Sequence, residues 1–311
     1  MVKEINSIMT PQGNTKYLFF GGKGGVGKTT MATATAVWFA DLGYKTTIVS
    51  TDPTVSLSAI FGQEISGEKR TPIRHIPNLC GLNINPADAM GVYQRRLNTT
   101  LGEFNEAMGG DLVSTPCMEE MATFDQFVSF LETPDADVIV FDTAPTGKTL
   151  RELAMPFDWA GFLERQIQEG NKLAEFLPNS TDTAQEIERD KKRYDEAMSV
   201  LCNKDTTVFN LVLLPERLPI EETQSAIRGL SKLGIPIQSL IINQCILQQV
   251  IDGNSFLQAR AKLQSVYLDE INARFKDILK TQIPLMDHDI SDKESMRELG
   301  RLIFEDNSND K

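Results

Sequence analysis

The sequence predicts an α/β fold: a mainly parallel sheet with helices on both faces and an inserted helical layer. Two observations carry this prediction. Short apolar strands alternate with helical segments along most of the 311 residues, which is typical of parallel sheets. The residues from about 156 to 203 break this alternation, since they are helical, charged and too long for a crossover. We interpret them as the inserted layer.

The first element is a glycine-rich loop that lies between the apolar run Tyr17-Leu-Phe-Phe20 and a helix-forming segment from Met31. It matches the phosphate-loop pattern G-x-x-x-x-G-K-S/T, which predicts a P-loop NTPase sheet. The loop consists of Gly22, Lys23, Gly24, Gly25, Val26, Gly27, Lys28, Thr29 and Thr30. Backbone N–H groups of such a loop bind phosphate, the lysine equivalent to Lys28 contacts the β- and γ-phosphates, and the hydroxyl of Thr29 is placed to bind Mg²⁺. A simple glycine-rich turn is the alternative, and the flanking strand and helix favour nucleotide binding.

The remaining elements follow in chain order. The sequence predicts strands at residues 45–52, 82–85, 137–142, 207–214 and 238–243, and helices at 221–233, 255–279 and 292–304.

We expect residues 1–311 to form a single P-loop NTPase domain, with helical segments at about 88–131 and 156–203. Residues 1–14 and 305–311 are polar and predict loose tails. The apolar stripe of the second helical segment fits packing on its own domain, and also a client groove or a subunit interface.

Composition excludes several classes of protein. The net charge of −12 argues against a nucleic-acid partner, because binding phosphate backbones needs a basic face. The N-terminal residues lack the apolar core of a secretory signal. The four cysteines are widely spaced, without a C-x-x-C pair or a disulfide signature. A cytoplasmic location is the expectation.

Two acids end predicted strands. Asp142 follows the apolar run Val138-Ile-Val-Phe141. In phosphate-loop enzymes the acid that holds Mg²⁺ also ends an apolar strand, so we expect Asp142 to bind the metal. The alternative role of Asp142 is a helix cap. Asp52 ends an adjacent strand, where it could orient the attacking water. Its alternative role is a turn with Pro53.

Three motifs together resemble one family. They are the loop with its additional Lys23, the segment Ser50-Thr-Asp-Pro53, and the segment Phe141-Asp-Thr-Ala-Pro-Thr-Gly147. The chain is similar in these to the ArsA arsenical-pump ATPases and to related ATPases that target tail-anchored membrane proteins. The resemblance continues through Leu214-Pro-Glu216, Glu222-Thr223, Ile242-Asn-Gln244 and Ile283-Pro-Leu285, and thus covers nearly the whole chain.

The resemblance implies an ATPase that uses ATP and Mg²⁺. Asp52 takes the position of the family's hydrolysis acid, and Asn243 that of its adenine-recognising residue. Pro284 and Leu285 would pack on the base. The additional lysine implies a homodimer with facing nucleotide sites, because in this class it contacts the nucleotide of the opposite subunit. Lys23, Lys28 and Asp52 are therefore the expected catalytic residues.

The resemblance leaves two functions open. One is the arsenite- or antimonite-stimulated ATPase of a metalloid efflux system, with a membrane pump as partner. The other is a chaperone that delivers tail-anchored membrane proteins as clients. The segment around Cys117 resembles the metalloid site of the pumps, and a thiolate is a soft ligand that suits arsenite. Targeting ATPases commonly have a C-x-x-C pair and a longer insertion, which this chain lacks. The second metalloid cysteine of the pumps is also missing. The pump is the preferred reading.

Overall fold

The computed structural model describes residues 2–51, 57–67, 69–84, 89–91, 93, 118–132, 134–143 and 180–305. The chain forms two compact units. The first contains Met1–Asn83, Asp135–Thr149 and Cys202–Lys311, and the second contains Ile84–Pro134 and Leu150–Leu201. Both helical segments expected from the sequence fall almost wholly in the second unit. The expected single domain with an inserted layer stays a prediction.

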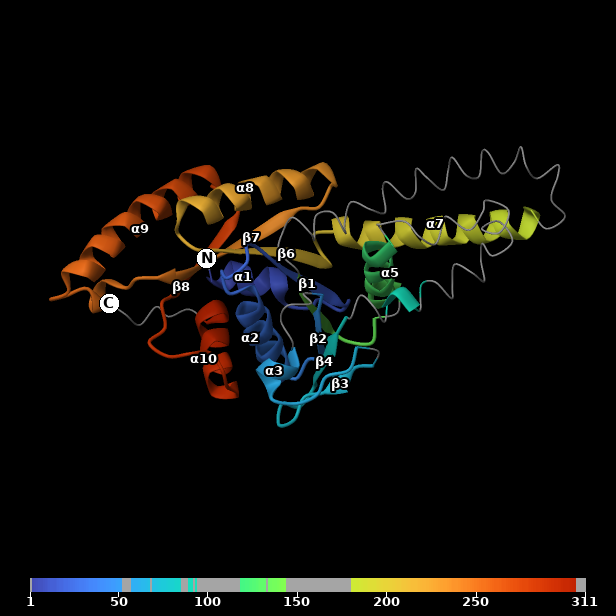
Figure 1. The fold of residues 1–311 in the computed structure, drawn as a ribbon, viewed down its shortest axis with the longest axis horizontal. Helices are drawn as coiled ribbons and strands as arrows, with labels where there is room; N and C mark the ends of the chain where they lie inside the picture. Colours follow the sequence, from blue (N-terminus) through green and yellow to red (C-terminus); the bar gives the residue numbers. More distant parts are fainter. Residues whose placement is uncertain are drawn as a thin grey trace. The chain divides into compact units, whose positions relative to one another are not determined.

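The first unit is built on an eight-stranded sheet with the order β3-β4-β2-β5-β1-β6-β7-β8 (Figure 1). Neighbouring strands are parallel except for β3 and β4, which are antiparallel. This confirms the α/β fold with a mainly parallel sheet. The strands are β1 (Lys16–Gly21), β2 (Thr46–Ser50), β3 (Thr71–Pro72), β4 (Leu79–Asn83), β5 (Val138–Asp142), β6 (Thr207–Leu213), β7 (Ile237–Cys245) and β8 (Leu279–Pro284).

Helices of the first unit cover both faces of this sheet (Figure 1). One face carries α1 (Val2–Met9), α2 (Lys28–Asp41) and α10 (Lys293–Phe304). On the other face, α8 (Arg217–Lys232) and α9 (Ser255–Arg274) pack on β6 and β7. The short helix α3 (Leu57–Phe61) and a 3₁₀ turn at Gln248–Val250 also belong to the described part of this unit. In the parts of the chain described here, no helix has the length and apolar character needed to cross a bilayer.

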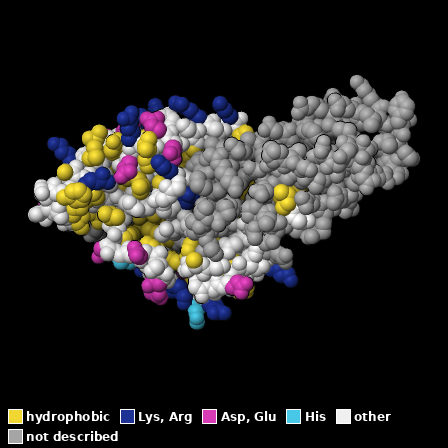
Figure 2. Space-filling model, in the orientation of Figure 1, with side chains coloured by type: hydrophobic (Ala, Val, Ile, Leu, Met, Phe, Trp, Pro, Cys, Tyr) yellow, Lys and Arg dark blue, Asp and Glu magenta, His cyan; other side chains and the backbone are white. Residues whose placement is uncertain are grey.

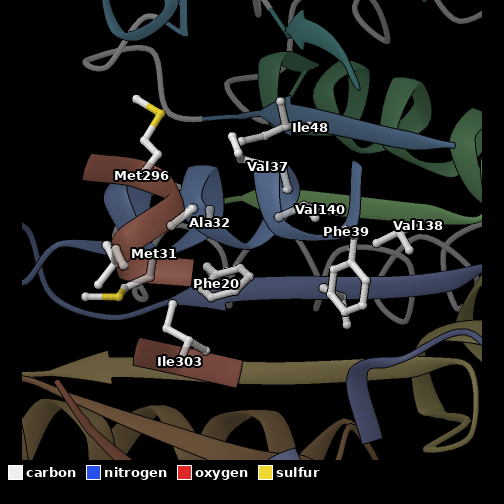
Figure 3. Packing of buried hydrophobic residues seen from close by; sticks show 14 of the residues in the cluster. Phe20, Met31, Ala32, Val37, Phe39, Ile48, Val138, Val140, Met296 and Ile303 are labelled. Carbon is white, nitrogen blue, oxygen red and sulfur yellow. The ribbon is translucent and has the colours of Figure 1, made fainter. Parts of the chain in front are cut away.

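The core beside α2 fixes the helix that follows the phosphate loop. Phe20 of β1, Met31 of α2 and Ile303 of α10 are buried in one cluster (Figure 3). Trp38 of α2 stacks on Phe304 of α10, with 5.5 Å between the ring centroids. Because α2 is held from two sides, its first turn has a fixed position relative to the sheet.

The N-terminal tail is a correction to the sequence-based prediction. Residues expected to be loose form α1, in which Ile5 and Met9 are completely buried. The reason is helical spacing: Ile5, Ile8 and Met9 share one face, and that face packs into the core with α10. Residues 306–311 of the second predicted tail lie outside the described part of the chain.

The C-terminal part of the predicted helix at 255–279 is a second correction. The helix α9 ends at Arg274, and residues from Leu279 form β8, a strand that the sequence did not indicate. Phe275 departs from helical geometry at φ −116° and ψ 37°, and its ring is buried. Burial of this side chain ends the helix, since no glycine or proline does so.

In the second unit, the structure describes α5 (Met118–Glu132) and α7 (Ser180–Cys202). An ionic cluster joins them. Arg193 of α7 forms ion pairs with Asp125 and Glu132 of α5, and the Tyr194 hydroxyl donates a hydrogen bond to Asp125. Desolvation opposes the charge of Arg193, but the bonds to these two carboxylates outweigh it and raise the pKa of the guanidinium. The cluster fixes α7 against the helix that begins directly after Cys117.

Candidate functional site

The phosphate loop runs from the end of β1 to the first residue of α2. Two of its glycines combine a positive φ with a close neighbour. Gly22 has φ +144°, and a Cβ atom there would lie 2.3 Å from the carbonyl oxygen of Val212. Gly27 has φ +99°, and its Cβ would lie 2.5 Å from Nδ2 of Asn243. These backbone conformations and close approaches exclude side chains, so the loop can wrap tightly enough to bind a phosphate.

Lys28 and Thr29 occupy the first turn of α2, where the helix dipole favours anions. The side chain of Lys28 is buried, and its Nζ donates to the carbonyl oxygen of Lys23 at 3.3 Å. The hydroxyl of Thr29 donates to Oδ2 of Asp142 at 2.7 Å. A hydroxyl and a carboxylate that lie in contact offer the oxygen ligands that Mg²⁺ prefers. The predicted metal-binding pair is thus together in the fold.

Strand pairing explains why Asp142 reaches the loop. In the sheet register, Asp142 of β5 lies between Phe20 of β1 and Ser50 of β2. The hydroxyl of Thr143 donates to the carbonyl oxygen of Phe20 at 2.9 Å and anchors the strand end. Asp52 follows the end of β2 but lies outside the described residues. Its role in orienting water stays a prediction.

Asn243 contacts the loop directly. It lies in β7, and its Nδ2 donates to the carbonyl oxygen of Val26 at 2.9 Å. Its Oδ1 accepts from the backbone N–H of Gln244 at 2.8 Å. A side-chain amide has two N–H donors and two acceptor lone pairs, so these bonds still allow contact with an adenine. In this structure, Asn243 positions the phosphate loop.

The residues expected to pack on the base lie at the end of the neighbouring strand. Pro284 is the last residue of β8, and the backbone N–H of Leu285 donates to the carbonyl oxygen of Cys245 at 2.9 Å. The Leu285 side chain is 52% exposed. It is therefore accessible to a planar ligand.

A cavity of about 460 Å³ lies beside the loop, within the size range of small-molecule sites. Lys23, Gly24 and Val26 line one side. The other side includes Glu216 before α8 and Arg260 of α9, which form an ion pair at 3.1 Å. The cavity joins the phosphate loop to the helices on the second face of the sheet.

Lys23 has a partner that sequence reasoning missed. Its Nζ lies 3.3 Å from Oε1 of Glu222, which is in α8. In the sequence, Glu222-Thr223 belongs only to the family resemblance, which implies no role for it. Since the two residues are about 200 positions apart in the chain, no local pattern could indicate their contact.

The described cysteines are unlike reactive thiols. Cys245 is buried, and burial raises its pKa to about 11. Burial also raises the pKa of the Cys80 and Cys202 thiols. No cluster of three metal-ligating side chains occurs among the residues that the structure describes. Cys117 lies outside them, one residue before α5.

The fold and the loop together define the class: this is a phosphate-loop NTPase. The sequence profile of the anion-transporting ATPase family matches residues 15–305. The chain belongs to this family and is an ATP-hydrolysing enzyme. The family resemblance seen in the motifs is thereby confirmed.

Curated relatives have names from both branches of the family. An arsenical pump-driving ATPase of Halobacterium salinarum is 35% identical over 298 residues, which cover 94% of this chain but only 44% of that protein. The ATPase ASNA1 homolog 1 of Paramecium tetraurelia is 31% identical, covering 94% of this chain and 93% of the relative. The ATPase GET3B of Arabidopsis thaliana is also 31% identical, covering 93% of this chain and 79% of the relative. The names do not favour one branch.

Proposed function

We propose that this ATPase is the arsenite- or antimonite-stimulated catalytic subunit of a metalloid efflux system. The segment from Cys117 to Phe127 carries the proposal, because it resembles the metalloid site of arsenical pumps. The absence of a C-x-x-C pair from the sequence also favours this branch over targeting. We also propose that the protein acts in the cytoplasm, that its partner is a membrane pump, and that it binds no nucleic acid.

The proposed chemistry uses the residues around the loop. Lys28 and the loop amides bind the phosphates of ATP, and Thr29 with Asp142 holds Mg²⁺. When bound there, Mg²⁺ would neutralise phosphate charge. Asp52 orients the attacking water and accepts its proton. Asn243, Pro284 and Leu285 bind the adenine, which favours ATP over other nucleotides.

Cys117 is the test of the metalloid site. A cysteine before the first turn of a helix has its thiolate favoured by the helix dipole, and α5 begins at Met118. We expect Cys117→Ser to abolish stimulation of ATP hydrolysis by arsenite or antimonite while unstimulated hydrolysis persists. The measurement is steady-state ATPase activity with and without metalloid.

The matched control is Cys202→Ser, because that thiol bonds the carbonyl oxygen of Leu233 within the first unit. This variant should retain stimulation. If Cys117→Ser responds to metalloid like the wild type, the metalloid site is elsewhere. Stimulation by a tail-anchor peptide alone would favour the targeting alternative.

We further propose a homodimer in which Lys23 contacts the nucleotide of the opposite protomer. The position of Lys23 supports it: the side chain is 36% exposed at the rim of the cavity. Exposed apolar side chains lie nearby, including Leu218 of α8 and Leu263 of α9, both of which also line the cavity. Figure 2 shows hydrophobic side chains gathered over the part of this face where α9 lies.

We expect light scattering to show a dimer in the presence of Mg²⁺ and a non-hydrolysable ATP analogue. Burial of the exposed leucines and the cation–phosphate contact would stabilise it. A monomer under these conditions at micromolar protein would contradict the proposal.

A further inference from the structure

The two lysines of the phosphate loop are held in different ways. Lys28 is buried and faces the loop itself, where its Nζ contacts the carbonyl oxygen of Lys23. The side chain of Lys23 leaves the loop and reaches α8, where its Nζ lies 3.3 Å from Glu222. The cation expected to serve the opposite protomer is thus paired within its own chain.

The fold makes this pairing possible. The strands β1 and β6 are adjacent and parallel, so the loop after β1 and the helix after β6 emerge at the same edge of the sheet. The neighbouring Thr223 is buried and Ile220 is completely buried, which fixes the turn of α8 that carries Glu222. The acid therefore has a defined position beside the loop.

The strength of the pair suits a reversible contact. Lys23 is 36% exposed and Glu222 is 48% exposed, and ion pairs with this exposure are weak and sensitive to salt. The phosphates of a nucleotide carry more negative charge than one carboxylate and form stronger charge-assisted hydrogen bonds. A nucleotide presented by a second protomer would therefore compete successfully for Lys23.

We propose that Glu222 is a positioning residue that holds Lys23 within its own protomer until a nucleotide-loaded partner takes it over. This inference rests on the proposed role of Lys23 at the opposite nucleotide. Its consequence is a threshold: closing the dimer must break two of these pairs, one in each protomer. Glu222 thereby weakens dimer formation and so limits the fraction of protomers that hydrolyse ATP.

The test is the isosteric variant Glu222→Gln. We expect the dimer dissociation constant, measured with Mg²⁺ and a non-hydrolysable ATP analogue, to fall by about two- to 30-fold, since two weak ion pairs no longer oppose closure. At protein concentrations below this constant, kcat should rise while the KM for ATP stays unchanged. The difference from wild type should shrink near 1 M salt, where the screening length is only about 3 Å.

The neighbouring acid provides the control. Glu221 lies on the same helix but pairs with Arg274 at 2.8 Å, so Glu221→Gln should dimerise like the wild type. An unchanged or weaker dimer in Glu222→Gln overturns the proposal. Lys23→Ala separates the two ideas: if it hydrolyses ATP normally, the opposite-protomer role fails and the inference fails with it. If Lys23→Ala is impaired but Glu222→Gln matches wild type, only the holding role of Glu222 is wrong.

Discussion

Replacing Lys28 by alanine should reduce ATP hydrolysis by at least about 100-fold, the usual loss when one fixed donor is removed from a developing charge. Lys28 is a buried cation of the loop and lies at the N-terminus of α2, where we propose that phosphate binds. Its removal leaves the phosphate charge without its main side-chain partner. Steady-state ATPase assays measure the loss, and a fluorescent ATP analogue measures the accompanying loss of affinity.

Lys45→Ala is the matched control for this substitution. Lys45 is 69% exposed and pairs with Asp135 at the opposite end of the strands, so its variant should hydrolyse ATP like the wild type. Circular dichroism should show the same helix content for both variants. Hydrolysis by Lys28→Ala within a factor of about three of wild type would rule out the assigned phosphate contact, because less than 1 kcal/mol would then depend on it.

The second large effect concerns stability of the second unit. Arg193→Met should destabilise the packing of α5 against α7 by about 3–5 kcal/mol, the cost of leaving a buried ion pair without one partner. Both side chains of the central pair are nearly buried: Arg193 is 15% exposed and Asp125 is 10% exposed. Hydrogen exchange of the α5 and α7 amides should report the change as a loss of protection by at least about 100-fold.

The preceding residue supplies the comparison. Lys192 pairs with Glu196 on the surface of the same helix, with both side chains mostly exposed, so Lys192→Met should change stability by less than about 0.5 kcal/mol. Amides of β1 should keep their protection in both variants, since β1 belongs to the first unit. Equal protection of α5 in the two variants would mean that the buried cluster contributes no net stability.

Most of the sheet could be predicted because its strands are short apolar runs between polar turns. β5 is one example: Val138 to Phe141 are all completely buried, and the predicted strand 137–142 differs from the observed one by a single residue. β8 could not be predicted in the same way. Its residues Leu279 to Pro284 alternate in burial and follow a helix without a local stop signal, so tertiary packing of Phe275 decides where the helix ends.

In the candidate site, too, the features set by local sequence could be predicted, and those set by tertiary packing could not. The loop could be predicted from the sequence because its backbone geometry allows only certain residue types at some positions. Gly27, which has a left-handed backbone conformation, is an example. The contacts of Asn243 with Val26 and of Lys23 with Glu222 join residues about 200 positions apart. Such contacts depend on which strands are neighbours in the sheet. The sequence pattern therefore indicated the residues expected to bind phosphate but not the contacts that hold the loop in place.

The packing of α10 on α2 has a consequence for the order in which the protein is made. The ribosome completes the loop, α2 and Asp142 long before it reaches residue 293. Until then, the α2 face that later contacts Met296 and Ile303 remains uncovered. The bond from Arg297 to Asp41 of α2, and the bond from Asn6 of α1 to the carbonyl oxygen of Phe304, form only after α10 has been synthesised. A nascent chain that has not reached residue 293 thus carries every phosphate-loop residue without the helix that packs on α2.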